Sequence, residues 1–374
     1  PHLLQADNPH VLNISPPLSM KAKWFAGHAA YTLSKFAMSM WVLGHSAEFA
    51  DRGVAFNALW PKTAIATAAV RNLLGGDKVI NASNRSKGVR KVMEKVLDLH
   101  PDAHLPPFHS DTLRRRDKGR TPLAAEVREA GPTRGKVALF ATCYCNVNTP
   151  DIGQDIIKVF EHNGIPVRMT DKEECCGMPK LEQGDLDTVE KYKNANVPEL
   201  VRLIDEGWDI VAGIPSCVLM FKQELPLMYP DDPDVQKVKA HMFDPFEYLM
   251  HRHKAGLLNT EFQNPLGKVV WQVPCHQRVQ NIGPKTRDIL QLVPDTQVEM
   301  IERCSGHDGT YGVRAETYEK SQKIARPVVS RVKRMEPDYL VSDCPMAATQ
   351  IADNLDLPNE ESSPLTLLRK AYGI

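Results

Sequence analysis

The sequence lacks an excess of either charge, because 46 lysines and arginines balance 46 aspartates and glutamates. Proteins that bind nucleic acid usually carry a basic excess, so we expect no nucleic-acid partner. No apolar run approaches the roughly 18 residues that suggest a membrane span, and the start, "PHLLQADNPH", has neither the basic nor the apolar part of an export signal. These absences predict a cytoplasmic protein with no membrane span, whose membrane contact would be peripheral, at the inner face.

Cysteine is missing from the first 142 residues and then occurs eight times. A disulfide framework is typical of small oxidised domains, which this long chain of expected cytoplasmic location is not. Single buried structural thiols would not explain why the spacing of the cysteines repeats. We therefore expect all eight to be candidate metal ligands: Cys143, Cys145, Cys175, Cys176, Cys217, Cys275, Cys304 and Cys344.

The cysteine pattern occurs twice along the chain. "GKVALFATCYCN" at 135–146 resembles "GKVVWQVPCHQR" at 267–278, and each predicts an apolar strand that ends in cysteine. "ECCGMPK" corresponds to "RCSGHDG", and the strand–cysteine–helix pattern around Cys217 corresponds to the one around Cys344. An internal duplication explains this echo and predicts two α/β units, at 133–262 and 263–374.

Parallel α/β sheets bring such cysteines together, because the loops at the carboxyl ends of the strands share one edge of the sheet. Helices that begin beside the thiols favour thiolate and a negatively charged cluster. The adjacent Cys175 and Cys176 cannot easily bind one small tetrahedral ion, whereas they can reach different irons of a larger cluster. The first unit therefore favours iron–sulfur chemistry over zinc.

From about residue 78 to the end, these motifs resemble the cysteine-rich CCG-domain family, which includes subunits of heterodisulfide reductase and of anaerobic glycerol-3-phosphate dehydrogenase. The resemblance implies a four-iron four-sulfur (4Fe-4S) cluster in the first repeat, held by Cys143 or Cys145 with Cys175, Cys176 and Cys217. The family motif usually closes with Cys-x-x-Cys, and "SCVLMF" supplies only one of these two cysteines.

The second repeat departs further from the family pattern, because "CSG" replaces the paired cysteines. Three thiols remain, and a 4Fe-4S cluster and zinc both stay open for them. The candidate ligands are Cys275, Cys304 and Cys344, with His276, His307 and Asp308 as candidates for the fourth position.

The family resemblance implies an electron-transfer component of an oxidoreductase more than a self-sufficient enzyme. Its expected partners are a flavin dehydrogenase or other redox subunit as donor and a quinone or thiol/disulfide compound as acceptor. We find no ferredoxin-like cysteine region in the sequence, so electrons would need another point of entry. A zinc-binding structural module is a lesser alternative.

Residues 76–132 predict a helical and proline-rich connector. The segment begins with an amphipathic helix and then becomes irregular after Pro101. We expect its histidines, His100, His104 and His109, to belong to a connector that packs over the cysteine units, rather than to a metal site. The basic run "RRRDKGR" at 114–120 is expected to be a solvated linker.

Residues 1–75 carry a different set of motifs, namely "NPHVLNISPP", "AYTLSKFAMSMWVLG" and "VAFNALWPKTAIAT". These resemble the carboxyl-terminal half of a short-chain dehydrogenase/reductase, and we expect a partial Rossmann-like fragment. The resemblance implies that Tyr31 is the general acid/base, that Lys35 lowers its pKa and holds the nicotinamide ribose, and that Ser15 polarises the substrate carbonyl. Residues four apart share one helical face, which suits Tyr31 and Lys35.

No glycine-rich phosphate-binding turn precedes these residues in the sequence. We therefore expect Ser15, Tyr31 and Lys35 to be vestigial and NAD(P) not to bind. The alternative is an NAD(P)-dependent short-chain carbonyl reductase that uses the same three residues.

Overall fold

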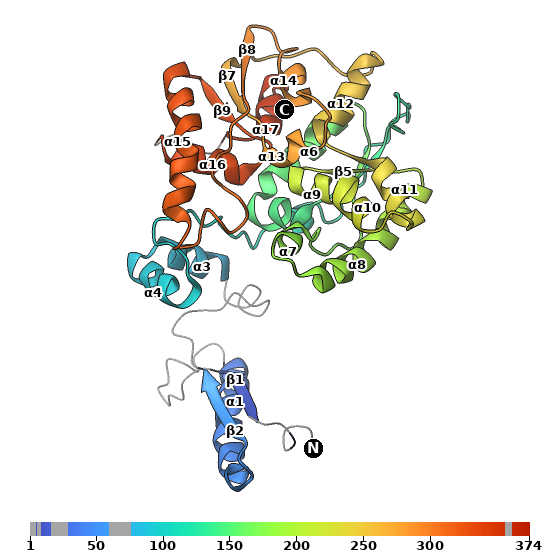
Figure 1. Ribbon diagram of the computed structural model, residues 1–374. Helices are drawn as coiled ribbons and strands as arrows, with labels where there is room; N and C mark the ends of the chain where they lie inside the picture. Colours follow the sequence, from blue (N-terminus) through green and yellow to red (C-terminus); the bar gives the residue numbers. More distant parts are fainter. Residues whose placement is uncertain (1–4, 6–8, 16–28, 60–75, 356–360) are drawn as a thin grey trace. The chain divides into compact units, whose positions relative to one another are not determined.

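The computed structural model describes residues 5, 9–15, 29–59, 76–355 and 361–374 (Figure 1). The chain forms two compact units, residues 1–80 and 81–374. This division falls where the sequence changes from one family resemblance to the other. Within the described residues, no helix is both long enough and apolar enough to cross a lipid bilayer.

The first unit contains a strand–helix–strand arrangement. Strand β1 (His10–Ile14) is followed by helix α1 (Ala29–Glu48), the short helix η3 (Ala50–Arg52) and strand β2 (Ala55–Leu59). The two strands pair in parallel, which is the basic unit of a doubly wound sheet. Several large apolar side chains of this unit are at least 59% exposed: Leu12, Leu33, Met40, Trp41 and Leu43.

The first cysteine repeat is built on a four-stranded parallel sheet of order β4-β3-β5-β6. Its strands are β3 (Val137–Phe140), β4 (Val167–Met169), β5 (Asp209–Ala212) and β6 (Met242–Phe243). All residues of β3 and β5 are buried, as expected for parallel strands that are covered on both faces. The helices of this repeat are η4 (Tyr144–Asn148), α6 (Pro150–His162), α7 (Met178–Glu182), α8 (Leu186–Asp205), α9 (Pro215–Leu219), η5 (Met220–Glu224), α10 (Leu225–Met228), α11 (Pro233–His241) and α12 (Pro245–Lys254).

The second repeat has a three-stranded parallel sheet of order β8-β7-β9. Its strands are β7 (Gly267–Gln272), β8 (Thr296–Ile301) and β9 (Tyr339–Val341), and its helices are α13 (Cys275–Arg278), α14 (Lys285–Leu290), α15 (Tyr318–Met335), α16 (Pro345–Asp353) and α17 (Pro364–Tyr372). The register matches that of the first sheet: Val137 pairs with Val167 and Asp209. Val269 pairs likewise with Val298 and Tyr339, which confirms two equivalent α/β units.

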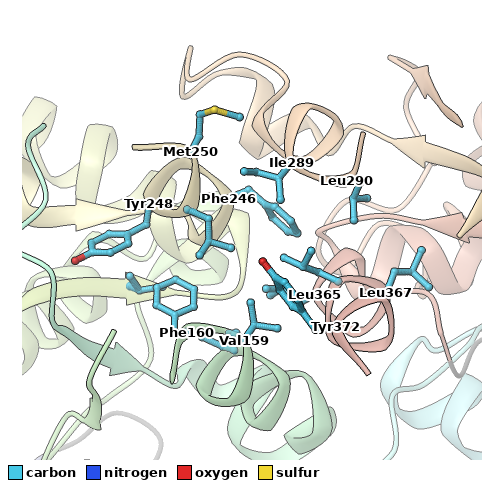
Figure 2. Packing of buried hydrophobic residues seen from close by; sticks show 14 of the residues in the cluster. Val159, Phe160, Phe246, Tyr248, Met250, Ile289, Leu290, Leu365, Leu367 and Tyr372 are labelled. Carbon is cyan, nitrogen blue, oxygen red and sulfur yellow. The ribbon is translucent and has the colours of Figure 1, made fainter. Parts of the chain in front are cut away.

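The two repeats share one apolar core. Helix α17 of the second repeat packs against α6 of the first, and α12 of the first packs against α14 of the second. Figure 2 shows Phe160 and Phe246 from the first repeat beside Ile289, Leu365 and Tyr372 from the second. These helix contacts between the repeats fix the position of one sheet, with its cysteine-bearing edge, relative to the other.

The connector contains α3 (Gly76–Arg85), α4 (Lys87–Leu97) and α5 (Leu113–Arg116). The prediction that it packs over the cysteine units is confirmed: His100 stacks on Tyr318 at 3.9 Å, and His104 lies 3.2 Å from Asp353. Leu113 is fully buried in the shared core.

The predicted solvated linker at 114–120 is wrong. Arg114 pairs with Glu173 at 3.0 Å, Arg116 with Asp151 at 2.6 Å, and Arg120 with Glu161 at 2.6 Å. Each carboxylate lies in the first cysteine repeat. These three arginines therefore hold the connector against the first cysteine repeat. The run of basic residues could not reveal this, because the carboxylates that pair with it come from distant parts of the sequence.

Candidate metal centre

Each cysteine of the first repeat follows one of the three adjacent strands β3, β4 and β5. Cys143 stands directly before η4 and Cys145 lies within it; η4 is a single π-helical turn of the kind that is frequent at functional sites. Cys175 and Cys176 come between β4 and α7, and Cys217 is the third residue of α9. The sheet order β4-β3-β5 therefore places all five thiols at one edge.

Four of these thiols lie close enough to shift one another's pKa. Cys143 interacts with Cys175, Cys175 with Cys176, and Cys176 with Cys217. Cys145 is fully buried, and its sulfur lies 3.4 Å from the point where a Cβ on Gly213 would stand. The structure thus brings together thiols that are up to 74 residues apart, from Cys143 to Cys217.

Hydrogen bonds and burial separate the protonation states of these thiols. Thiol hydrogen bonds from Cys143 and Cys176 lower the pKa of Cys175 to about 3, with help from the Gly177 amide and the Lys180 ammonium. The pKa values of Cys143 and Cys176 are raised, first by these same bonds and then by burial. Burial raises the pKa of Cys145 to about 12. One thiolate is therefore stabilised among protonated thiols, which would have to release their protons to a metal.

Two unusual backbone conformations shape this edge. Gly177 has φ 100°, a conformation that glycine adopts readily, and it begins the turn into α7. Thr142 has φ 63° although it is not glycine, and its hydroxyl accepts a hydrogen bond from the Cys145 amide at 3.1 Å. A buried threonine in the left-handed region is the kind of strain that collects at functional sites. Nothing in the sequence pattern identified Thr142.

The second repeat reproduces the central part of this geometry. Cys275 begins α13, after β7, and its thiol interacts with that of Cys304, which follows β8. The Gly306 amide donates to the Cys304 sulfur at 3.3 Å. The Cys275 thiol lowers the pKa of Cys304 to about 6, although burial opposes the shift. Cys304 and Cys175 therefore correspond by motif, because each lies two residues before a glycine whose amide faces the sulfur.

A cavity of about 260 Å³ opens beside the thiols of the second repeat. All six candidate ligands of this repeat line it: Cys275, His276, Cys304, His307, Asp308 and Cys344. The first repeat also contributes to the wall, through Met178, Glu182 and Pro215. Burial lowers the pKa of His307 to about 4, so this imidazole is neutral and able to bind a metal.

The last cysteines of the two repeats are not equivalent, contrary to the sequence prediction. Strand pairing equates Asp209 with Tyr339, so the counterpart of Cys344 is Ile214. Cys344 stands before α16, whereas Cys217 lies inside α9. Each repeat therefore keeps a different half of a Cys-x-x-Cys motif. Burial raises the pKa of Cys344. Cys344 lines the same cavity as Pro215 and Ser216, which directly precede Cys217, so the two cysteine sites are neighbours.

Within the described part of the chain, no group of three or more histidine, cysteine or acidic side chains is arranged to hold a single metal ion. The thiols of the first repeat nevertheless lie close enough to shift one another's pKa.

The amino-terminal candidates belong to the first compact unit. Ser15 is buried at the end of β1 and accepts a hydrogen bond from the Ser39 hydroxyl at 2.7 Å. Tyr31 and Lys35 lie one turn apart on α1, and the Lys35 ammonium contacts the Met38 sulfur at 4.0 Å. The side chain of Tyr31 and residues 60–67 of the third motif lie outside the described residues. The roles of the three residues therefore stay predictions.

Comparison with known proteins agrees with both resemblances. The CCG cysteine-rich domain matches residues 137–222 and 269–352. The chain is 28% identical over 297 residues to the C subunit of anaerobic glycerol-3-phosphate dehydrogenase from Escherichia coli K12, and the match covers 79% of this chain and 72% of the relative.

The amino-terminal unit matches a different group of proteins. It is 59% identical over 80 residues to hydroxysteroid dehydrogenase-like protein 2 of Danio rerio, a match that covers 21% of this chain and 19% of the relative. The human protein of that name is 54% identical over 76 residues, or 20% of this chain and 18% of the relative. The chain thus spans about a fifth of the length of these relatives.

Proposed function

We propose that this chain, which carries two copies of the CCG cysteine-rich domain, is an iron–sulfur electron-transfer subunit of a multisubunit dehydrogenase. The observation that carries the proposal is the group of neighbouring thiols Cys143, Cys175, Cys176 and Cys217 at the ends of β3, β4 and β5. Thiols from three strand ends meet there, and thiolates are the ligands that iron–sulfur clusters require.

The donor set of the first repeat fits a 4Fe-4S cluster. Five thiols are available, and Cys145 is a reserve donor that is already buried at the same edge. A bound cluster would supply one-electron redox chemistry. The chain would hold it with Cys143 or Cys145 and with Cys175, Cys176 and Cys217, while the Gly177 amide and Lys180 stabilise negative charge at Cys175.

The second repeat would hold either a 4Fe-4S cluster or zinc. It offers three thiols on one cavity, together with neutral imidazole and carboxylate donors from His276, His307 and Asp308. Both kinds of site accept such ligands. Metal analysis decides between them.

The donor would be a flavin dehydrogenase or another redox subunit, because the relative from Escherichia coli is the C subunit of an anaerobic glycerol-3-phosphate dehydrogenase. The acceptor would be a quinone or a thiol/disulfide compound. We place the protein in the cytoplasm, with peripheral contact at the inner face of the membrane as the route to a quinone.

The test is anaerobic reconstitution with iron and sulfide, followed by metal analysis and visible spectroscopy. We expect broad visible absorbance that dithionite bleaches, with bound iron and sulfide. Cys176→Ser should lose most of this absorbance, whereas Ser216→Ala, which changes the cavity wall without removing a thiol, should retain it. A colourless protein that binds only zinc would favour the structural zinc module instead.

The match of the amino-terminal unit supports a second candidate function, an NAD(P)-dependent carbonyl reductase that uses Ser15, Tyr31 and Lys35. The parallel strand–helix–strand arrangement of that unit suits a part of such an enzyme. This alternative requires nucleotide binding, which a titration with NAD(P) measures directly.

A further inference from the structure

The connector contacts the loop that carries Cys145. The Asn148 side chain donates to the Pro107 carbonyl at 2.8 Å, and the His109 amide donates to the Val147 carbonyl at 2.9 Å. The Arg114 amide donates to the Asn146 side chain at 3.1 Å. Residues 107–114 therefore follow η4 along its length and hold the turn that begins at Cys143.

The connector also contacts the loop that carries Cys175 and Cys176, through the side chain of Arg114. Its guanidinium donates to the Thr170 carbonyl at 2.6 Å and to the Thr170 hydroxyl at 2.8 Å. It also pairs with Glu173 Oε2 at 3.0 Å. Thr170 is the first residue after β4, so Arg114 holds the start of this loop from outside the sheet.

Glu173 completes the link between the two loops. Its Oε2 accepts a hydrogen bond from the Ala141 amide at 2.9 Å and another from the Thr170 hydroxyl at 2.8 Å. Ala141 is two residues before Cys143, and Glu173 is two residues before Cys175. The carboxylate thus joins the ends of β3 and β4 at the point where each strand delivers its cysteine.

The carboxylate of this pair is nearly removed from water, whereas the Arg114 side chain is 28% exposed. The Glu173 side chain is only 8% exposed, and one oxygen receives three donors, which suits an ionised carboxylate. A buried carboxylate is strongly unfavourable without a partner, and Arg114 is the cation in contact with it. Burial raises the pKa of the Glu173 carboxyl, and the charge of Arg114 together with the hydrogen bonds from Thr170 and Ala141 opposes that shift and favours the ionised form.

The second repeat joins its corresponding loops without charge. The Gln272 amide donates to the Arg303 carbonyl at 2.9 Å, and its oxygen accepts from the Ser342 hydroxyl at 2.8 Å. These contacts link the ends of β7, β8 and β9 within the repeat itself. The first repeat is thus the one that depends on a side chain from the connector.

We propose that Arg114 and Glu173 are positioning residues of the first cysteine site, which hold the Cys143 loop and the Cys175–Cys176 loop at cluster-binding distance and set the reduction potential of the bound cluster through their two charges. The effect on the reduction potential rests on the proposed function, because it requires a bound cluster, whereas the positions of the two loops do not. Through Arg114, the connector forms part of the first cysteine site.

Reduction potentials test the electrostatic part. Removing a nearby negative charge favours addition of an electron, so Glu173→Gln should raise the potential of the first cluster. Arg114→Gln leaves the buried carboxylate unpaired and should lower it, and the double variant should lie between the two. Arg116→Gln is the matched control, because Arg116 is on the same short helix but pairs with Asp111 and Asp151. A purely structural role would not produce opposite shifts.

Hydrogen exchange of the metal-free, reduced protein tests the positioning part. Arg114→Gln and Arg114→Lys should both speed exchange at Ala141 and at residues 171–177, because lysine cannot reproduce the two-pronged contact with Thr170. Arg114→Lys should nevertheless keep a potential close to that of the unchanged protein, because it keeps the charge.

Unchanged exchange in the Arg114 variants, or shifts of the potential in the same direction in Arg114→Gln and Glu173→Gln, would overturn the proposal. If the unchanged protein takes up no cluster, the proposed function fails, and hydrogen exchange still decides whether the pair holds the loops.

Discussion

Replacing Gly306 with alanine should destabilise the second repeat more than the same change at Gly177 destabilises the first. Both glycines follow a cysteine motif, and both have positive φ, 80° and 100°. Their surroundings differ. A Cβ on Gly306 would lie 2.2 Å from the Ser321 carbonyl oxygen, which belongs to helix α15. A Cβ on Gly177 would meet the end of the Met220 side chain at 3.3 Å, and that side chain is flexible.

The magnitudes follow from adding two effects. An alanine in the left-handed region costs about 1–3 kcal/mol, and this applies at both positions. Overpacking against a rigid neighbour adds about 1–3 kcal/mol, and it applies only at Gly306. The neighbour cannot move easily, because the Ser321 hydroxyl donates to the Gly306 carbonyl at 2.8 Å and Gln350 donates to the Ser305 carbonyl at 2.9 Å. We therefore expect a loss of roughly 2–6 kcal/mol for Gly306→Ala and roughly 1–3 kcal/mol for Gly177→Ala.

The assay is urea unfolding of the reduced, metal-free protein, monitored by hydrogen exchange in β3 and in β7 so that each sheet is reported separately. Gly184→Ala is the control for backbone strain alone, because its φ is 74° and a Cβ there would meet no atom within 4 Å. The losses should increase from Gly184 through Gly177 to Gly306. Equal losses for Gly177→Ala and Gly306→Ala would show that the contact with Ser321 is not rigid, and would refute the reasoning.

Three further predictions concern the thiols, a buried carboxyl group and the amino-terminal unit. Cys176→Ser should remove most of the visible absorbance of the reconstituted protein, whereas Cys304→Ser should leave the spectrum of the first repeat largely intact. Iron analysis and a redox titration of both variants test this. Full iron content in Cys176→Ser would contradict the cluster assignment. Burial, together with the charges of Asp343 and Glu247, raises the pKa of Asp244 to about 7. The native state therefore binds this proton more tightly than the unfolded chain does. As a result, the free energy of unfolding falls as pH rises from about 4 to 7. Asp244→Asn keeps a side chain that can cap α12. In unfolding experiments across this pH range, the variant should lose roughly 1–4 kcal/mol less stability than the unchanged protein. An unaltered pH profile would contradict this prediction. Calorimetric titration of the whole chain should detect no binding of NAD or NADP, and tight binding would instead support the reductase alternative.

The strand ends and the duplication were predictable because they depend on local patterns. Apolar runs such as Val137–Phe140, each followed by cysteine and then a helix, predict parallel strands with thiols at one edge. The repetition of this pattern predicts that Cys304 is the counterpart of Cys175, and the two glycine amide contacts agree. Local patterns could not give the offset of Cys217 and Cys344, because a three-residue difference in a loop becomes visible only when the strands are paired.

The sequence by itself determined that cysteines lie at the site. A cysteine that stands between a strand and the following helix can be recognised from a short segment of the chain. Tertiary structure alone decided what surrounds them. Arg114 and Glu173 are 59 residues apart, and each is an ordinary charged residue in its own segment. They meet because Leu113 is buried in the core that the two repeats share, which carries the connector onto both cysteine loops. An ion pair between distant segments depends on how packing arranges them in space, and no local pattern of residues records that arrangement.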